Sequence, residues 1–183
     1  MKKELEQKLF ENHPLLFFRR NNPTKHSLMG ASLSVGDGWF DLINILCYQL
    51  TDNYRRAKDD YEFYLKFQTR SSEIDILNER RQINPDDPTV KNKIFYSPIH
   101  VEKARLAMQN ALDNTPVALQ VKEKFGTLRF YTDRNTPISY ALINMAENLS
   151  STICETCGDK ALETSEHNGW IHTLCAKHHN PKE

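Results

Sequence analysis

Hydrophobic residues recur at helical spacing in the first third of the chain. The first twelve residues set Leu5, Leu9 and Phe10 among charged side chains, which predicts a short helix that stops near Pro14. A longer helix follows, for which Asp37 is the expected N-cap. Its apolar positions are Trp39, Phe40, Ile43, Leu46, Cys47, Leu50 and Tyr54. The pattern leaves open how far this helix continues.

Two further helices and a hairpin are predicted in the second half. Residues 99–112 and 137–149 repeat apolar side chains every three or four positions, and the proline at 137 suits the first turn of a helix. Alternation of apolar and polar residues over 117–131 predicts a β-hairpin that turns at 125–127. Residues 82–98 contain three prolines and are expected to form a loop. The apolar face of the last helix consists of Ile138, Ala141, Leu142, Met145 and Leu149.

Length and charge narrow the class of protein. The 183 residues hold 24 Lys plus Arg and 24 Asp plus Glu, which argues against a strongly basic nucleic-acid binder and against an acidic DNA mimic. The length favours a single domain. No apolar run reaches the roughly 18–20 residues that span a bilayer, and the start lacks the apolar stretch of a signal peptide. We therefore expect a soluble cytoplasmic protein without membrane association.

Three of the four cysteines lie in the last thirty residues, with the spacing of zinc ligands. Cys154 and Cys157 form a C-x2-C pair, Cys175 follows seventeen residues after that pair, and His178 follows after two more. Three thiolates and one imidazole around Zn²⁺ make a closed site, which is typical of structural zinc. A redox dithiol or a disulfide is the alternative, but the βαβ context of a thioredoxin-like motif is missing. His179 is an alternative fourth ligand.

The predicted zinc site also indicates a fold. A two-cysteine knuckle, a Gly-Trp hairpin and a ligand pair that opens a helix follow the order of a treble clef. We therefore predict an α+β protein: a mainly helical domain over 1–152 with one β-hairpin, and a treble-clef-like zinc element over 153–183 packed on it. The spacing resembles that of GATA-type fingers, but residues 154–183 hold five acidic side chains against three lysines, which would not attract DNA. Zinc is thus expected to act as a structural staple.

Candidate binding residues lie on the predicted hairpin. Lys122, Lys124 and Arg129 interleave with aromatic residues such as Tyr131, as in proteins that bind single-stranded nucleic acid. The alternative is that the aromatic rings pack inward and the lysines are solvated on the outer face. Trp39 is a further candidate, as a wall of a ligand pocket shared with Arg129 and Tyr131.

Other residues that carry chemistry have simpler explanations. Cys47 lies on the apolar stripe of a helix and is expected to be a buried, inert thiol. Asp37 lies between two glycines, where a helix cap is favoured over a Mg²⁺ site shared with Glu123, Asp133 and Glu147. The sequence contains no nucleophile elbow, no phosphate-binding loop and no metalloprotease motif. An enzymatic activity is therefore unsupported.

Three sequence blocks stand out: GDGWFDLINILC at 36–47, QVKEKFGTLRFY at 120–131 and CETCG…GWIHTLCAKH at 154–178. Together they resemble a family of uncharacterised proteins of tailed bacteriophages and prophages. The chain departs from that family at His178, where a fourth cysteine is common. The resemblance implies a phage origin and expression inside a bacterial host cell.

These observations lead to one favoured function and two alternatives. The favoured function is a non-enzymatic binding protein that modulates or inhibits a host protein, for example a defence protein, with zinc as a structural cofactor. The first alternative is a nucleic-acid-binding protein that uses the basic and aromatic hairpin. A metal-dependent nuclease or hydrolase is the less favoured alternative. The oligomeric state is left open.

Overall fold

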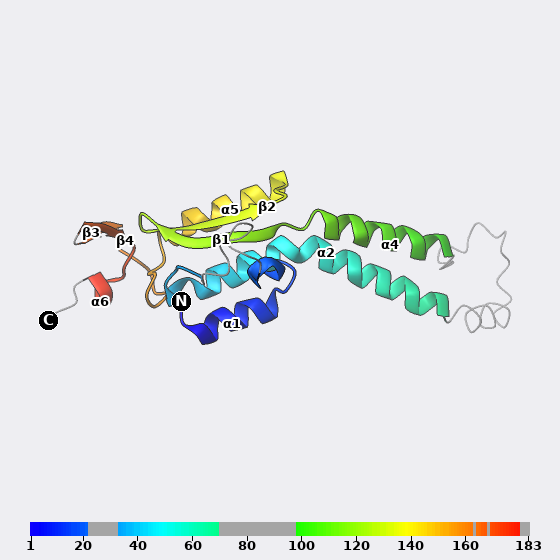
Figure 1. Cartoon of the computed structure of the whole chain (residues 1–183), viewed down its shortest axis with the longest axis horizontal. Coiled ribbons are helices and arrows are strands. Elements are labelled where there is room, and N and C mark those ends of the chain that lie inside the picture. Colours follow the sequence, from blue (N-terminus) through cyan, green and yellow to red (C-terminus); the bar gives the residue numbers. More distant parts are fainter. Residues whose placement is uncertain (22–32, 70–97, 163, 168, 180–183) are drawn as a thin grey trace, which may run out of the picture. The chain divides into compact units, whose positions relative to one another are not determined.

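The computed structural model describes residues 1–21, 33–69, 98–162, 164–167 and 169–179. Over these residues the fold is α+β and mainly helical, with an antiparallel hairpin, as the sequence predicts. The predicted loop at 82–98 lies outside the described residues except for Pro98. In chain order the elements are α1 (Lys3–Asn12), η1 (Phe18–Asn21), η3 (Asp37–Trp39), α2 (Phe40–Thr69), α4 (Pro98–Asp113), β1 (Val117–Lys124), β2 (Thr127–Asp133), α5 (Pro137–Ser150), β3 (Ser165–His167), β4 (Trp170–His172) and α6 (Ala176–His179) (Figure 1).

The chain folds into two compact units. Unit 1 consists of Met1–Asp52 and Asn114–Glu183, and unit 2 of Asn53–Asp113. Helix α2 begins in unit 1 and continues into unit 2 without interruption. The C-terminal cysteines therefore belong to the same unit as the N-terminal core, and every candidate site residue named above lies in unit 1.

The β1–β2 hairpin is the centre of unit 1. Its strands pair antiparallel with Val121 opposite Phe130, and a two-residue loop joins them. Both loop residues have positive φ, 55° at Phe125 and 72° at Gly126, as in a type I′ turn, whose twist matches that of the strands. The side chain of Glu123 fixes this turn by accepting a hydrogen bond from the Gly126 amide over 2.6 Å.

Both edges of this hairpin are covered by other parts of unit 1. On the β1 edge, the Ala118 amide donates to the Leu16 carbonyl, and Ser34 pairs with the strand through two backbone hydrogen bonds. On the β2 edge, α5 supplies side chains: the Leu128 amide donates to Ser150 Oγ and the Phe130 amide to a Glu147 carboxylate oxygen, each over 2.9 Å. Covered edges cannot recruit a further strand.

The inner face of the hairpin packs on the first part of α2. Val121, Leu128 and Phe130 point inward and are buried, as strand alternation predicts. Cys47 is fully buried in this core, as predicted, and burial raises the pKa of its thiol, so it stays protonated and inert. The other buried members of the core are Leu9, Phe10, Leu16, Phe17, Leu33, Val35, Trp39, Ile43, Leu46, Leu50, Ala118, Ile143 and Ala146.

The start of α2 differs from the prediction. Asp37 is not the N-cap of the long helix, because it is the first residue of the short 3-10 helix η3, whose N-cap is Gly36. It accepts instead from the Lys2 amide over 2.6 Å, with the Lys2 ammonium 3.3 Å away. These contacts lower the pKa of the Asp37 carboxyl, the amide hydrogen bond being the largest cause. The aspartate therefore fastens the start of α1 to the start of α2.

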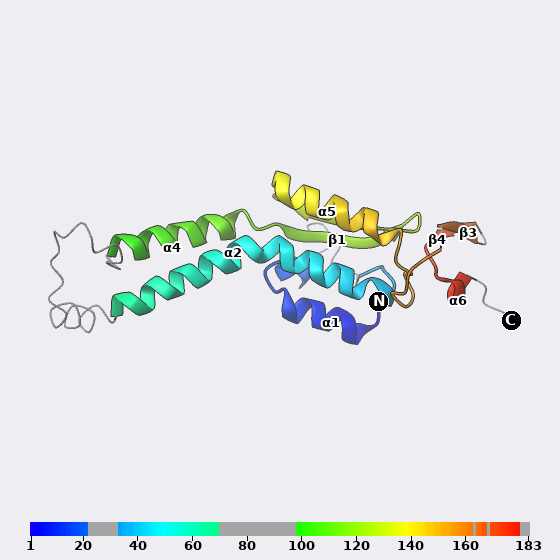
Figure 2. The same cartoon turned by 180° about the vertical axis from the view of Figure 1, so that it is seen from behind.

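Helix α5 turns its predicted apolar face away from the core. Its buried positions are Ser139, Ile143, Ala146 and Ser150, which form a different stripe from the one that hydrophobicity selects. The reason lies in β2, whose unpaired edge amides need hydrogen-bond acceptors that only polar side chains can supply. Figures 1 and 2 show α5 along the side of β2.

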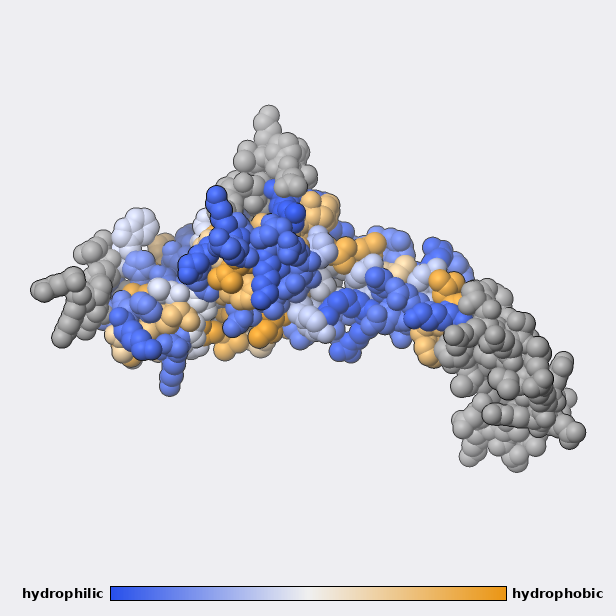
Figure 3. Space-filling view, turned by 90° about the horizontal axis from the view of Figure 1, so that it is seen from below, coloured by the Kyte–Doolittle hydropathy of each residue, from blue (hydrophilic) through white to orange (hydrophobic). Residues whose placement is uncertain are grey.

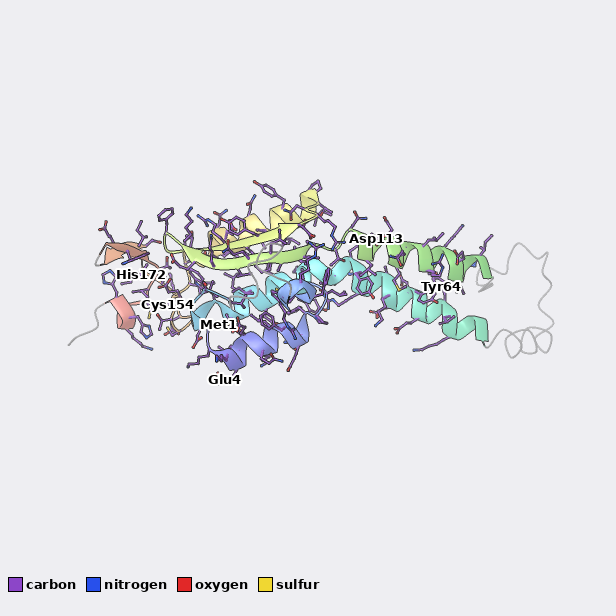
Figure 4. The ribbon with its side chains drawn as sticks, in the orientation of Figure 1. Met1, Glu4, Tyr64, Asp113, Cys154 and His172 are labelled. Atoms are coloured by element: carbon purple, nitrogen blue, oxygen red, sulfur yellow. The ribbon has the colours of Figure 1, made fainter. Side chains whose placement is uncertain are left out.

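Unit 2 consists of the second part of α2 and helix α4, which lie side by side in both views (Figures 1 and 2). The ring of Tyr64 stacks on His100, with 5.9 Å between the ring centroids (Tyr64 is labelled in Figure 4). Ala104 and Ala111 are the buried positions of α4. None of the helices in the described ranges combines the length and apolar character that crossing a bilayer requires. The space-filling view in Figure 3 shows hydrophilic and hydrophobic side chains interspersed on the face that it presents.

Candidate metal centre

Three thiols and one imidazole converge at the C-terminal end of unit 1. The ligand atoms of Cys154, Cys157, Cys175 and His178 all lie within 4.8 Å of one another (Cys154 is labelled in Figure 4). Cys157 Sγ is 3.6 Å from Cys175 Sγ, and His178 Nδ1 is 3.5 Å from Cys154 Sγ and 3.2 Å from Cys175 Sγ. The four residues that the spacing singled out are thus brought together.

These separations fit a tetrahedral zinc ion. With Zn–S bonds of about 2.3 Å and Zn–N bonds of about 2.0 Å, neighbouring ligand atoms of a tetrahedron are roughly 3.5–3.8 Å apart. The observed thiol and imidazole separations are close to these values, whereas a disulfide needs sulfurs about 2.05 Å apart. The geometry therefore suits a metal site and does not suit a bond between Cys157 and Cys175.

The backbone around the first two cysteines is shaped to hold the sulfurs. Gly158 has a φ of 82°, which lets the chain turn back so that its amide donates to the Cys154 carbonyl over 2.9 Å. The Cys154 amide in turn donates to the Asp159 carbonyl over 2.8 Å. This is a tight knuckle. The third cysteine directly precedes α6, whose first turn carries His178.

The electrostatics of the cluster favour anionic sulfur at Cys154 but oppose it at Cys157. Burial raises the pKa of the Cys154 thiol, but the amides of Cys175, Cys157 and Thr156 together outweigh burial and lower that pKa to about 6. The pKa of His178 is raised, first by its hydrogen bond to the Cys175 sulfur. The Asp159 amide lowers the pKa of Cys157, yet burial and the neighbouring thiolates prevail and raise it to about 11. Crowded thiolates that repel one another are stabilised by a bound cation.

The GDGW segment, residues 36–39, packs against the backbone of this knuckle and supports it. The Gly38 amide donates to the Glu155 carbonyl over 2.9 Å, and Trp39 Nε1 donates to the Ile153 carbonyl over 2.8 Å. A Cβ atom at Gly38 would collide with the backbone of Cys154, Cys157 and Gly158, and one at Gly36 with the backbone of Glu155. The sequence pattern did not predict this role for either glycine.

A second contact fixes the zinc element to the β1–β2 hairpin. Thr173 is fully buried, and its hydroxyl donates to the Gly126 carbonyl in the type I′ turn. A Cβ at Gly126 would collide with the Thr164 side chain and crowd that of Ile171. The segment between the second and third ligands is therefore packed against the hairpin turn. Neither Gly126 nor Thr173 was predicted to have this role.

The candidate binding residues of the β1–β2 hairpin lie on one face of it, but Trp39 does not lie with them. Lys122, Lys124, Arg129 and Tyr131 share the outward face of β1–β2, opposite the buried Val121 and Phe130. The Lys122 ammonium lies 5.4 Å from the centre of the Tyr131 ring, and the Arg129 guanidinium lies 3.7 Å from a Glu147 carboxylate oxygen.

Trp39 does not join these residues, and its prediction as a ligand-pocket wall is wrong. It is fully buried in the core beneath the knuckle, where its one polar atom is bonded to the Ile153 carbonyl. An aromatic ring with no exposed surface cannot contact a ligand in this conformation. Its large apolar area is instead used for packing.

The carboxylates considered for Mg²⁺ are held apart by bonds to the chain itself. Asp37 binds Lys2, Glu123 binds the Gly126 amide, and Glu147 binds the Phe130 amide. Asp133 accepts from the Val117 amide over 2.8 Å and pairs with Arg19 at 2.9 Å. Within the described ranges, only the Cys154 cluster brings three or more such groups together.

Chemically, the cluster offers four protein ligands and no position set aside for water or substrate, which is the arrangement of a structural rather than a catalytic metal.

Beside it, His172 Nδ1 lies 2.7 Å from a Glu155 carboxylate oxygen, and burial raises the pKa of that carboxyl. His172 is half-buried in this pair. Comparisons with protein-family models, curated proteins and solved structures give no match to the chain.

Proposed function

We propose that this protein is a non-enzymatic binding protein, encoded by a bacteriophage or prophage, that acts on a host protein in the bacterial cytoplasm. In this proposal a structural zinc ion on Cys154, Cys157, Cys175 and His178 shapes the binding surface. The phage origin and the host target rest on the three-block resemblance. The zinc and the surface rest on the geometry of unit 1.

Zinc is the proposed metal because of the donor set. Three thiolates and an imidazole at tetrahedral separations favour zinc over magnesium or calcium, which prefer oxygen ligands. Bound zinc would neutralise the crowded thiolates and join the knuckle at Cys154 to the start of α6. The metal would thereby hold the β3–β4 hairpin between them in place.

One observation carries the binding proposal: the zinc element leaves aromatic and apolar side chains exposed where it meets the β1–β2 turn. Phe125 is 64% exposed in the turn, and Trp170 is 70% exposed in β4, next to Ile171, whose side chain a Cβ at Gly126 would crowd. We call Phe125, Trp170 and Ile171 the aromatic end. Exposed aromatic residues on rigid hairpins are the type of side chain that dominates protein–protein binding energy. Lys124, whose ammonium lies 5.1 Å from the Phe125 ring centre, favours a partner with acidic groups around an apolar pocket.

Nucleic-acid binding is the second candidate, because Lys122, Lys124, Arg129 and Tyr131 share one exposed face. Glu147 offsets the charge of Arg129, so two lysines supply most of the basic character. Such a small footprint predicts weak binding with a shallow salt dependence. A protein partner therefore agrees better with the charges on this face.

Metal analysis tests the zinc site. Purified protein is expected to contain about one zinc per chain, and the paired change Cys154→Ser with Cys157→Ser is expected to abolish it. The adjacent histidines give a matched pair: His178→Ala should weaken zinc binding strongly, whereas His179→Ala should not. Cobalt substitution should give the visible absorption of a tetrahedral thiolate site.

Cys47→Ala is the control for cysteine removal as such, because Cys47 lies in the core away from the cluster and should leave zinc content unchanged. Full zinc retention by the paired serine variant would show that these cysteines are not the ligands. Equal effects of His178→Ala and His179→Ala would remove His178 from the ligand set.

Affinity capture tests the binding proposal. Zinc-loaded protein on a resin is incubated with bacterial lysate, with and without nuclease treatment, and the captured protein is then purified and titrated. The change Phe125→Ser with Trp170→Ser is expected to weaken binding by roughly a hundredfold, as for two central aromatic residues. The control is Tyr140→Ser, which removes an exposed ring of α5.

Two results would contradict this proposal. Capture that disappears on nuclease treatment, together with salt-sensitive binding of single-stranded oligonucleotides, would favour the nucleic-acid candidate. Equal binding by the aromatic-end variant and by Tyr140→Ser would show that the aromatic end is not the contact surface.

A further inference from the structure

Helix α5 exposes an apolar stripe. Ile138 is 74% exposed, Met145 is 54% exposed and Leu149 is 44% exposed, while Leu142 between them is half-buried and packs partly against the core. We call these four residues the α5 stripe. The opposite side of the helix is already occupied by β2 and the core. An amphipathic helix normally buries its most hydrophobic stripe, whereas three of the four members of this one are left exposed within the described residues.

The α5 stripe is symmetric along the helix. Successive members are four, three and four positions apart, which is the spacing of a two-helix seam. Reversing the order gives the same spacing, so a second α5 running antiparallel would bring Ile138 against Leu149 and Leu142 against Met145. A twofold contact requires this kind of self-complementary patch.

The charges of α5 also favour pairing with itself. Glu147 is its only charged side chain, and it is bonded to the Phe130 amide and close to Arg129 on the β2 side. Two copies of the stripe therefore meet without like-charge repulsion. The stripe itself has no charge with which to select a charged partner.

We propose that a second copy of this chain docks on the α5 stripe, forming an antiparallel helix pair about a twofold axis. The proposal goes beyond the binding function above and uses different residues from the aromatic end. Helix α5 has 14 residues, about 21 Å of helix at 1.5 Å per residue. A contact of this length lies at the small end of specific interfaces, so the dimer is expected to dissociate in the micromolar range.

Sedimentation equilibrium of the zinc-loaded protein from about 1 µM to about 500 µM tests this. The wild type should move from monomer to dimer across that range. Met145→Lys, next to the twofold axis, should weaken the dimer tenfold or more, because two like charges would face apolar groups. Met145 is exposed, so circular dichroism and zinc content should stay unchanged. Leu106→Lys is the matched control on an exposed leucine of α4 and should dimerise like the wild type.

The antiparallel register has its own test. Ile138→Lys and Leu149→Glu should each weaken self-association, and an equimolar mixture of the two should recover a heterodimer, because only antiparallel pairing places position 138 against position 149. A wild type that stays monomeric, or a Met145→Lys dimer of unchanged affinity, would overturn the proposal. A mixture without heterodimer would overturn the antiparallel register.

Discussion

At the scale of single residues, the need for glycine at certain positions of unit 1 comes from the atoms that lie against them. Gly38 has an ordinary backbone conformation, so flexibility is not the reason for a glycine there. The knuckle backbone lies against its Cα and leaves no room for a side chain. The residue that positions the metal site is thus more than a hundred positions away in the sequence.

Replacing Gly38 by alanine is therefore expected to damage the zinc site from a distance. The added Cβ would meet the backbone of Cys154 and Gly158, which can move only if the knuckle shifts. We expect the free energy of unfolding to fall by about 2–3 kcal/mol, and zinc affinity to fall with it. Urea unfolding and competition with a zinc chelator measure the two effects.

The control is Gly169→Ala. Gly169 has a φ of 81°, but a Cβ added there would meet no atom within 4 Å, so alanine introduces backbone strain without a collision. A cost of about 1–2 kcal/mol and unchanged zinc affinity are expected. If Gly38→Ala retained wild-type zinc affinity, close packing at Gly38 would not be what positions the knuckle.

At the scale of elements, α5 serves the edge of a strand as well as the core. Its N-terminus is fixed by a reciprocal capping box between Thr136 and Ser139. Its buried stripe combines Ile143 and Ala146, which join the core, with Ser150, which together with Glu147 reaches the amides of β2. A helix whose side chains must accept hydrogen bonds from the unpaired amides of an edge strand has fewer positions on that side for large apolar residues.

Ser150→Ala tests this relation. Ser150 is fully buried, and its hydroxyl accepts from the Leu128 amide and donates to the Glu147 carbonyl. Alanine would leave the Leu128 amide buried without an acceptor, which costs about 2 kcal/mol of stability. Thermal or urea unfolding measures the change.

Ser151→Ala is the neighbouring control. Its hydroxyl also donates to a backbone carbonyl, that of Asn148, but in an exposed setting where water can replace it. A change within about 0.5 kcal/mol is expected. Equal losses of stability in the two variants would show that Ser150 does not stabilise the protein by accepting a hydrogen bond from the edge of β2.

At the scale of the whole molecule, the C-terminal segment with the candidate metal ligands belongs to the same compact unit as the N-terminal core. Unit 1 unites residues from before and after unit 2, and the knuckle contacts Gly38 and Trp39 on one side while Thr173 contacts the hairpin turn. Loss of zinc should therefore loosen the knuckle and its two contact sites. The pairing of α2 and α4 in unit 2 uses none of these residues.

The sequence alone determined the local features of this protein. The positions of α1, the hairpin, α4 and α5 follow from periodicity, because the helical and strand periods are properties of the backbone. The four clustered ligands follow from their spacing, since a metal knuckle and the first turn of a helix are local structures.

Tertiary structure decided which sides of these elements are used. Hydrophobicity selects an apolar stripe on α5, but only the location of the core and of the β2 edge determines which positions are buried, namely Ser139, Ile143, Ala146 and Ser150. Trp39 looked like a ligand contact until its ring was found beneath the knuckle. The need for glycine at positions 36 and 38 comes from the backbone of the knuckle, which lies against them. In each case the deciding neighbour is far away in the chain, and a local pattern carries no information about it.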